Sequence, residues 1–207
     1  SSSKIRVIHH GFDGEFFGTR VSQEELASRL KKYQLHEKSY CLYVGALQPR
    51  KNLTRLIQAF EQAKKAVPEM KLVLVGEAAW LAESILTVRE KSVYREDILL
   101  TGRVSFEDVR ALYQGARLFV FPSLYEGFGL PILEAFASGV PVLTASNSSL
   151  TEVAGRAALY CNAESVPDIA EKLEYLWRDE ALRKNLVARG TEQLKHFSWE
   201  KCAKETL

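Results

Sequence analysis

Short apolar runs alternate with amphipathic stretches along the whole chain. Most of the runs are apolar at consecutive positions, as in parallel strands that are covered by helices on both faces. The predicted strands are Arg6–Ile8, Tyr40–Gly45, Lys71–Gly76, Ile98–Thr101, Leu118–Phe121, Val140–Thr144 and Ala157–Tyr160. This alternation predicts an α/β fold with a doubly wound, Rossmann-like parallel sheet.

The stretches between the runs have helical periodicity and recognisable ends. Asn52 can cap a helix whose apolar residues repeat at helical spacing from Leu53 to Phe60, and Pro68 closes it. Ser105 opens another helix in the same way. Further helices are predicted at Glu24–Tyr33, Ala79–Lys91, Pro131–Ala137, Pro167–Trp177, Ala181–Lys195 and Trp199–Leu207. No repeat or Pro/Gly/Ser linker divides the chain, so residues 1–207 are expected to form one domain.

Composition narrows the functional classes. The 28 basic and 26 acidic residues nearly balance, which argues against nucleic acid as a partner. The three cysteines form no CxxC pair, so we expect reduced, structural thiols. The longest apolar runs are far shorter than the ~20 residues that cross a bilayer. We therefore expect no transmembrane segment, and no secretion leader is visible at the start.

Two adjacent cations follow the second predicted strand. Arg50 and Lys51 lie in the loop that leads into the helix after Asn52. In open parallel sheets, ligands bind at the carboxyl ends of the strands, and free amides at a helix N-terminus favour anions. The loop is a candidate diphosphate site, and the alternative is a solvated basic turn.

The loop after the fifth predicted strand carries two carboxylates around two glycines. Gly127 and Gly129 permit close approach of a ligand to the backbone, and Pro131 suits a first helical turn. Glu134, one turn into that helix, can accept hydrogen bonds from a ribose diol. Glu126 would lie beside the group attached to the phosphates. The alternatives are a helix-dipole carboxylate for Glu134 and a surface turn residue for Glu126.

A third loop, around Val104, offers backbone groups that could recognise a base edge. Neither GxGxxG after the early strands nor a Walker-type motif is present, and the histidines have no metal-ligand spacing. We therefore expect no metal site and no cofactor.

The segment EGFGLPILEAFASGVPV, with seven residues between Glu126 and Glu134, resembles the double-glutamate motif of glycosyltransferase family 4. YVGALQPRKNLTRLIQAF resembles the phosphate-binding part of that family, and LVLVGE, LLTGRV, RLFVFPS and FSWEKCA follow in the expected order. The resemblance extends from Lys4 onward. It implies the C-terminal, donor-binding half of a two-domain glycosyltransferase-B fold, without the N-terminal acceptor domain.

The resemblance also implies roles for individual residues. Arg50 and Lys51 would hold the diphosphate, Glu134 the ribose, and Val104 would lie by the base. Ala46 stands where many members have arginine, which leaves Arg50 and Lys51 as the principal cations. The donor sugar would contact Glu126 and the backbone of Gly127, Phe128, Gly129 and Leu130.

The resemblance implies a retaining glycosyltransferase. The Pro-Arg-Lys-Asn loop is similar to that of members that build bacterial surface polysaccharides, which favours mannose from GDP-mannose and leaves a UDP-sugar open. The acceptor would be a sugar or a lipid-linked glycan. The expected location is cytoplasmic, with the inner face of the membrane as a peripheral alternative. Two rival functions remain, namely half of a nucleotide-sugar epimerase and a non-catalytic nucleotide-sugar-binding module.

Overall fold

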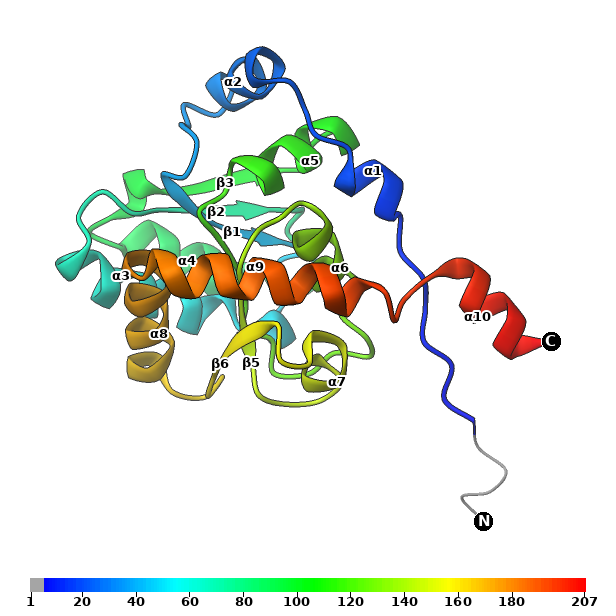
Figure 1. Cartoon of the computed structure of the whole chain (residues 1–207). Coiled ribbons are helices and arrows are strands. Elements are labelled where there is room, and N and C mark those ends of the chain that lie inside the picture. The colour runs from blue at the N-terminus through cyan, green and yellow to red at the C-terminus, as the bar shows by residue number, and fades with distance from the viewer. Residues whose placement is uncertain (1–5) are drawn as a thin grey trace.

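The centre of the molecule is a parallel sheet of six strands, shown in a computed structural model that describes residues 6–207 (Figure 1). The strands are β1 (Tyr40–Val44), β2 (Lys71–Val75), β3 (Ile98–Gly102), β4 (Leu118–Phe121), β5 (Val142–Ala145) and β6 (Ala158–Cys161). Their order is β3-β2-β1-β4-β5-β6, with parallel pairing throughout. The predicted doubly wound, Rossmann-like sheet is confirmed. Its strand order reverses between β1 and β4, where such sheets bind ligands.

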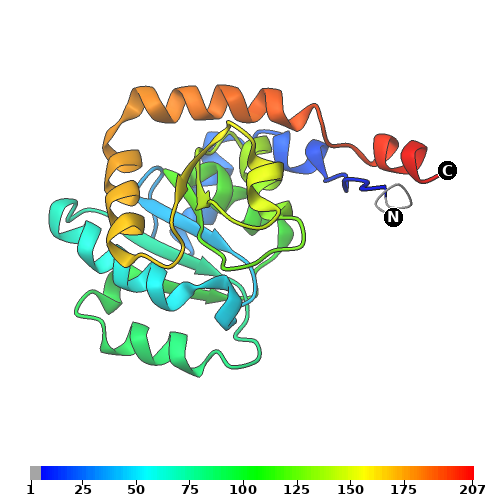
Figure 2. The same ribbon diagram turned by 90° about the horizontal axis from the view of Figure 1, so that it is seen from below.

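Helices cover both faces of this sheet. The helices are α1 (Gly14–Gly18), α2 (Gln23–Lys31), α3 (Leu53–Ala66), α4 (Glu83–Lys91), α5 (Phe106–Gly115), α6 (Leu130–Ala137), α7 (Leu150–Ala154), α8 (Val166–Arg178), α9 (Glu180–Leu194) and α10 (Trp199–Thr206). On one face α3 packs against α4 and α8, and on the other α5 packs against α2, and α6 against α9 (Figures 1 and 2). Among the described residues, no helix has the length and apolarity to cross a membrane.

The prediction of a strand at Arg6–Ile8 is wrong. These residues pair with no strand in the described part of the chain. Their segment runs instead beside the start of α10 (Figure 1), where a Cβ on Gly11 would lie 2.2 Å from the backbone nitrogen of Trp199. An apolar triplet shows β-propensity but not whether a neighbouring strand is available. Lys4, at which the resemblance to the family begins, lies among residues 1–5, which are outside the described part of the chain.

A partly buried ion cluster connects α2 to α5. Asp108 accepts hydrogen bonds from Arg29 (2.7 Å), Lys32 (3.2 Å) and the Tyr33 hydroxyl (2.9 Å). Burial opposes ionisation of Asp108, but the hydrogen bonds outweigh it and lower the pKa of this carboxyl. Burial and the same contact raise the pKa of Tyr33 to about 12. The cluster is a structural element that stabilises the packing of two helices.

Candidate functional site

The loops after β1 and β4 meet where the strand order reverses. Asn52 joins them, because its side-chain amide donates to the carbonyl oxygens of Pro122 (3.0 Å) and Ala163 (2.6 Å). The Leu124 amide donates to the carbonyl of Arg50 at 2.8 Å. The prediction that Asn52 caps α3 through its side chain is wrong, since it adopts a left-handed conformation (φ 63°) and makes no capping bond. Its amide instead holds the two loops together.

Glu126 lies between the two predicted phosphate-binding cations. Its carboxylate is 2.7 Å from the Arg50 guanidinium and 2.6 Å from the Lys51 ammonium. Glu126 and Lys51 are 7% and 8% exposed, and the Lys51 ammonium also lies 5.0 Å from the centre of the Phe121 ring. Two cations and one carboxylate leave this cluster with a net positive charge. An entering anion would compete with Glu126 for the same N–H groups.

The glycines between the carboxylates shape the start of α6. Gly127 is exposed, with open space where a side chain would be. Gly129 precedes the helix with φ 117°, a conformation that a residue with a Cβ rarely adopts. Leu130 begins the helix, and Pro131 needs no amide partner there. The backbone at Gly127 is therefore open to close approach by a ligand.

Two serines in the loop after β5 form hydrogen bonds with the backbone of the Glu126 loop. Ser148 Oγ accepts from the Glu126 amide at 3.2 Å. Ser149 Oγ lies 2.9 Å from the carbonyl oxygens of both Glu126 and Phe128. The backbone on either side of Gly127 is thus held by side chains from the next loop of the sheet.

Phe128 packs against the segment before α1 and against the connection between α9 and α10. Its ring centre is 5.3 Å from that of His10, 6.1 Å from His9 and 5.8 Å from Phe197. His9 Nε2 also lies 2.7 Å from a carboxylate oxygen of Glu152. His9 and His10 therefore contact the candidate sugar-binding loop.

Glu134 is in a different environment from Glu126. Its Oε2 accepts a hydrogen bond of 2.8 Å from the hydroxyl of Tyr113 on α5, and no basic side chain of residues 6–207 lies within ion-pair distance. Burial raises the pKa of Glu134, and the bond from Tyr113 opposes this rise. Burial and the Glu134 charge raise the pKa of Tyr113 well above its usual range, so the phenol stays protonated and donates.

Glu134 and Leu130 face a cavity of about 530 Å³. Its lining includes Phe12, Phe16, Phe17, Phe106, Glu107 and Trp199. A volume of this size suits a small organic ligand, and its aromatic walls suit a planar ring. Val104 lies in the loop between β3 and α5, packs half-buried against the core, and is absent from the described lining. The structure thus groups Arg50 with Lys51 and Glu126, and Leu130 with Glu134, but not Val104 with either group.

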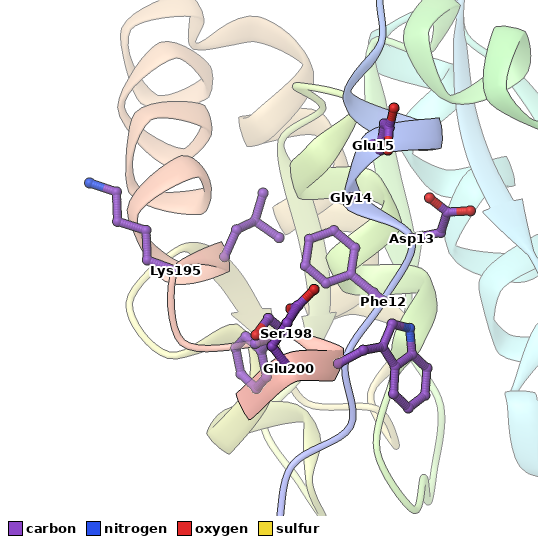
Figure 3. A pocket seen from close by; sticks show the side chains of 10 residues that line it. Phe12, Asp13, Gly14, Glu15, Lys195, Ser198 and Glu200 are labelled. Carbon is purple, nitrogen blue, oxygen red and sulfur yellow. The ribbon is translucent and has the colours of Figure 1, made fainter. Parts of the chain in front are cut away.

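A second cavity, of about 630 Å³, lies between the segment that leads into α1 and the connection from α9 to α10 (Figure 3). Phe12 to Glu15 line one side, and Leu194, Lys195 and Phe197 to Glu200 line the other. Its described lining contains none of the residues predicted to bind a ligand. Within residues 6–207, no three histidine, cysteine or acidic side chains are grouped as a metal site would require.

Sequence reasoning missed the residues that hold the two glutamates in place. Tyr113 occupies an apolar position of a helix, which predicts core packing and nothing more. Ser148 and Ser149 follow a buried strand as ordinary loop residues. Their position at the carboxyl end of β5, next to β4, is the one available signal.

Comparisons with known proteins agree with this fold. The family model described as Glycosyl transferases group 1 matches residues 27–193. The chain is 39% identical over 190 residues to O-antigen chain mannosyltransferase B of Escherichia coli, covering 90% of this chain and 49% of the relative. It is 32% identical over 206 residues to serotype-specific mannosyltransferase WbdA of the same organism, covering 98% and 25%. The chain therefore spans half or less of the length of these relatives.

Two solved structures share the fold. A glycosyltransferase from Rickettsia africae ESF-5 superposes with a TM-score of 0.88 at 19% identity, over 100% of this chain and 56% of the other. The C-terminal domain of the glycosyl transferase group 1 family protein LpcC from Francisella tularensis superposes with a TM-score of 0.75 at 21% identity, over 89% and 97%. In the second case the match is to nearly the whole of a separate C-terminal domain.

Proposed function

Because the chain belongs to the glycosyl transferases group 1 family, we propose that it is the donor-binding domain of a retaining transferase. The donor is a nucleoside-diphosphate sugar, with GDP-mannose favoured over a UDP-sugar. The product is a polysaccharide or a lipid-linked glycan. The names of the two Escherichia coli relatives support mannose and O-antigen synthesis. An N-terminal domain, in keeping with the greater length of these relatives, would supply the acceptor site.

The observation that carries this proposal is the cluster of Arg50, Lys51 and Glu126 where the strand order reverses. When a sugar leaves a nucleoside diphosphate, negative charge develops on the departing phosphate, and fixed cations stabilise it. Arg50 and Lys51 lie on a short turn that is bonded to the neighbouring loop, so they are already in place. In the free protein Glu126 supplies the counter-charge that phosphate oxygens would take over.

The cavity and the loop beside this cluster support a position for the nucleoside and for the sugar. The nucleoside would enter the cavity beside Glu134, whose carboxylate accepts hydrogen bonds from the ribose hydroxyls. Val104 would lie at the far edge of the base. The sugar would lie against the segment from Gly127 to Leu130, whose backbone is open at Gly127. Glu126 would be its polar neighbour once the diphosphate holds the cations.

Catalysis would combine leaving-group stabilisation with attack from the same face of the sugar. Glu126 is ion-paired with both cations, which suits electrostatic tuning better than the role of a covalent nucleophile. Positive charge from two side chains would serve the diphosphate without a divalent metal.

Calorimetry with guanosine, GDP, UDP and GDP-mannose tests the proposal on the 207-residue chain. We expect GDP to bind more tightly than guanosine, GDP to bind more tightly than UDP, and a chelator to leave binding unchanged. We also expect GDP-mannose to bind with little turnover, because the acceptor site would lie in the proposed N-terminal domain. Failure of every nucleoside diphosphate to bind would contradict the proposed function, and efficient transfer by the chain would contradict the division into two domains.

A further inference from the structure

Tyr113 is held rigidly with its hydroxyl directed at Glu134. Its side chain is fully buried, and its ring packs edge-on against Phe17 (5.7 Å between ring centres) and beside Phe119 (5.3 Å). Its oxygen lies 2.8 Å from Glu134 Oε2 and 3.4 Å from the Pro131 carbonyl. The carboxylate is the better-placed acceptor, and the packed ring leaves the hydroxyl little freedom to choose another.

Two other buried tyrosines show what ordinary core packing requires. The hydroxyl of Tyr40 donates to the backbone carbonyl of Leu112 at 2.7 Å, and that of Tyr43 to the carbonyl of Ala46 at 3.1 Å. A neutral backbone acceptor thus satisfies a buried phenol in this sheet. Tyr113 differs because its acceptor is an ionisable side chain that faces the candidate nucleoside cavity.

We propose that Tyr113 is a positioning residue, which fixes the carboxylate of Glu134 so that it accepts hydrogen bonds from both ribose hydroxyls. This inference rests on the proposed function, and it extends that function to the selection of the ribose diol. The hydrogen bond from the phenol to Oε2 favours one orientation of the carboxylate, and Glu134 lines the cavity that the nucleoside would enter. Preorganisation of this kind lowers the cost of binding.

The charges around Glu134 make the phenol important for ionisation as well. Glu107 from α5 and Asp13 from the segment before α1 line the same cavity as Glu134, and Tyr43 of β1 acts on Tyr113. Arg110 of α5 lies over the ring of Phe16, 4.7 Å from its centre, and forms no ion pair with Glu134. Tyr113 thus opposes the effect of burial on the Glu134 pKa, and its loss would raise that pKa further.

The test compares Tyr113→Phe with Tyr40→Phe, a matched control that removes an equally buried hydroxyl from a backbone acceptor. Calorimetry measures the affinities for GDP and for 2′,3′-dideoxy-GDP. The ratio of the first affinity to the second reports how much the ribose diol contributes to binding. We expect Tyr113→Phe to lower this ratio about five- to tenfold and to move the acid limb of GDP binding to higher pH. Tyr40→Phe should leave both the ratio and the pH profile unchanged.

A second readout needs no ligand. The side-chain carboxyl of Glu134 can be followed by carbon-13 NMR, with its signal assigned by its loss in Glu134→Gln. We expect the pKa of Glu134 to rise in Tyr113→Phe and to stay unchanged in Tyr40→Phe. An unchanged ratio together with an unchanged titration in folded Tyr113→Phe would overturn the positioning role.

Glu134→Gln separates this inference from the function on which it rests. If Glu134→Gln lowers the GDP to dideoxy-GDP ratio while Tyr113→Phe does not, the positioning role fails and the ribose assignment stands. If neither variant lowers the ratio, the ribose assignment of Glu134 fails, and the inference fails with it.

Discussion

Glu126 and Glu134 are the same residue type, one loop and one helical turn apart, yet their carboxylates have opposite electrostatic environments. Glu126 lies between two cations at 2.6 and 2.7 Å, and little of it is exposed. Glu134 has a neutral phenol as its hydrogen-bond donor at 2.8 Å, and burial raises its pKa. One carboxylate is compensated by charge and the other only by a hydrogen bond.

This difference supports the proposal that the two residues serve different parts of a ligand. A carboxylate that neutralises cations can be replaced by another anion, which is why the proposed function places Glu126 with the phosphates and the sugar attached to them. A carboxylate that faces a cavity without a cation can serve only hydrogen-bond donors, as the hydroxyls of a ribose are. The same difference predicts opposite effects on stability when each is replaced by its neutral isostere.

Glu126→Gln should have the largest effect. Removing the negative charge leaves the buried Lys51 ammonium without its counter-ion, which should lower the free energy of unfolding by about 2–3 kcal/mol. Saturating GDP should reduce the difference in the free energy of unfolding between this variant and the wild-type protein, because phosphate oxygens supply the missing negative charge. Urea denaturation with and without GDP measures both values.

Asp108→Asn is the matched control for this rescue. Asp108 is also a buried carboxylate with two cationic partners, but it lies between α2 and α5. Its loss should destabilise the protein by less than Glu126→Gln does, because Lys32 is half exposed and Arg29 keeps Glu25 as a partner at 2.8 Å. GDP should leave the difference in stability between Asp108→Asn and the wild-type protein unchanged. Equal rescue of both variants, or of neither, would remove the link between Glu126 and the diphosphate.

Arg50→Ala should weaken GDP and GDP-mannose by about 1.5–2 kcal/mol and leave guanosine unaffected. The side chain is 46% exposed, so its removal should change stability by less than that of Glu126. Calorimetry at several salt concentrations measures the loss, and the salt dependence of GDP binding should become flatter. A loss of guanosine affinity equal to that of GDP would show that Arg50 acts on the fold of the site.

Glu134→Gln should raise stability slightly at neutral pH. Because burial raises the pKa of Glu134 in the folded state, its favourable contribution is present below about 4.5 and is lost as pH rises through the folded pKa. The glutamine variant does not titrate, so its free energy of unfolding relative to that of the wild-type protein should rise from acid to neutral pH. Urea titrations across this range measure the trend, and a falling difference would contradict it.

Ser149→Ala should have the smallest effect, about 0.5–1 kcal/mol on GDP-mannose affinity. The serine holds the carbonyls of Glu126 and Phe128, which flank Gly127. GDP and guanosine should bind as in wild type, since Arg50 and Glu134 are unaffected. Competition binding with GDP and GDP-mannose measures the difference, and an equal loss for both ligands would place Ser149 elsewhere in the site.

Strand positions were predictable from sequence where burial decided them. The run Leu118–Phe121 coincides with β4, because consecutive apolar residues suit a strand that is buried on both faces. Arg6–Ile8 failed because pairing depends on a neighbour that local pattern does not reveal. The convergence of the loops after β1 and β4 was also predictable, since carboxyl ends of parallel strands share one edge.

The detailed chemistry of the site was less predictable. That Glu126 would contact both Arg50 and Lys51 depends on the geometry of two loops about 75 positions apart in sequence. Asn52 is a typical N-cap residue, but tertiary partners recruited its side chain instead. The contact of Tyr113 with Glu134 could not be predicted, because a residue that only packs in the core and one that also holds a site residue occupy the same apolar positions of a helix.

The binding of guanosine to the two isosteric variants tests the central claim most directly. Guanosine has the ribose diol but no phosphate or donor sugar, so it should contact Glu134 and not Glu126. In calorimetry at neutral pH, we predict that Glu134→Gln weakens guanosine binding by about 1–2 kcal/mol and that Glu126→Gln leaves it within about 0.3 kcal/mol of wild type. If Glu126→Gln weakened guanosine as much as Glu134→Gln does, the two glutamates would not divide the ligand between them, and the account would be wrong.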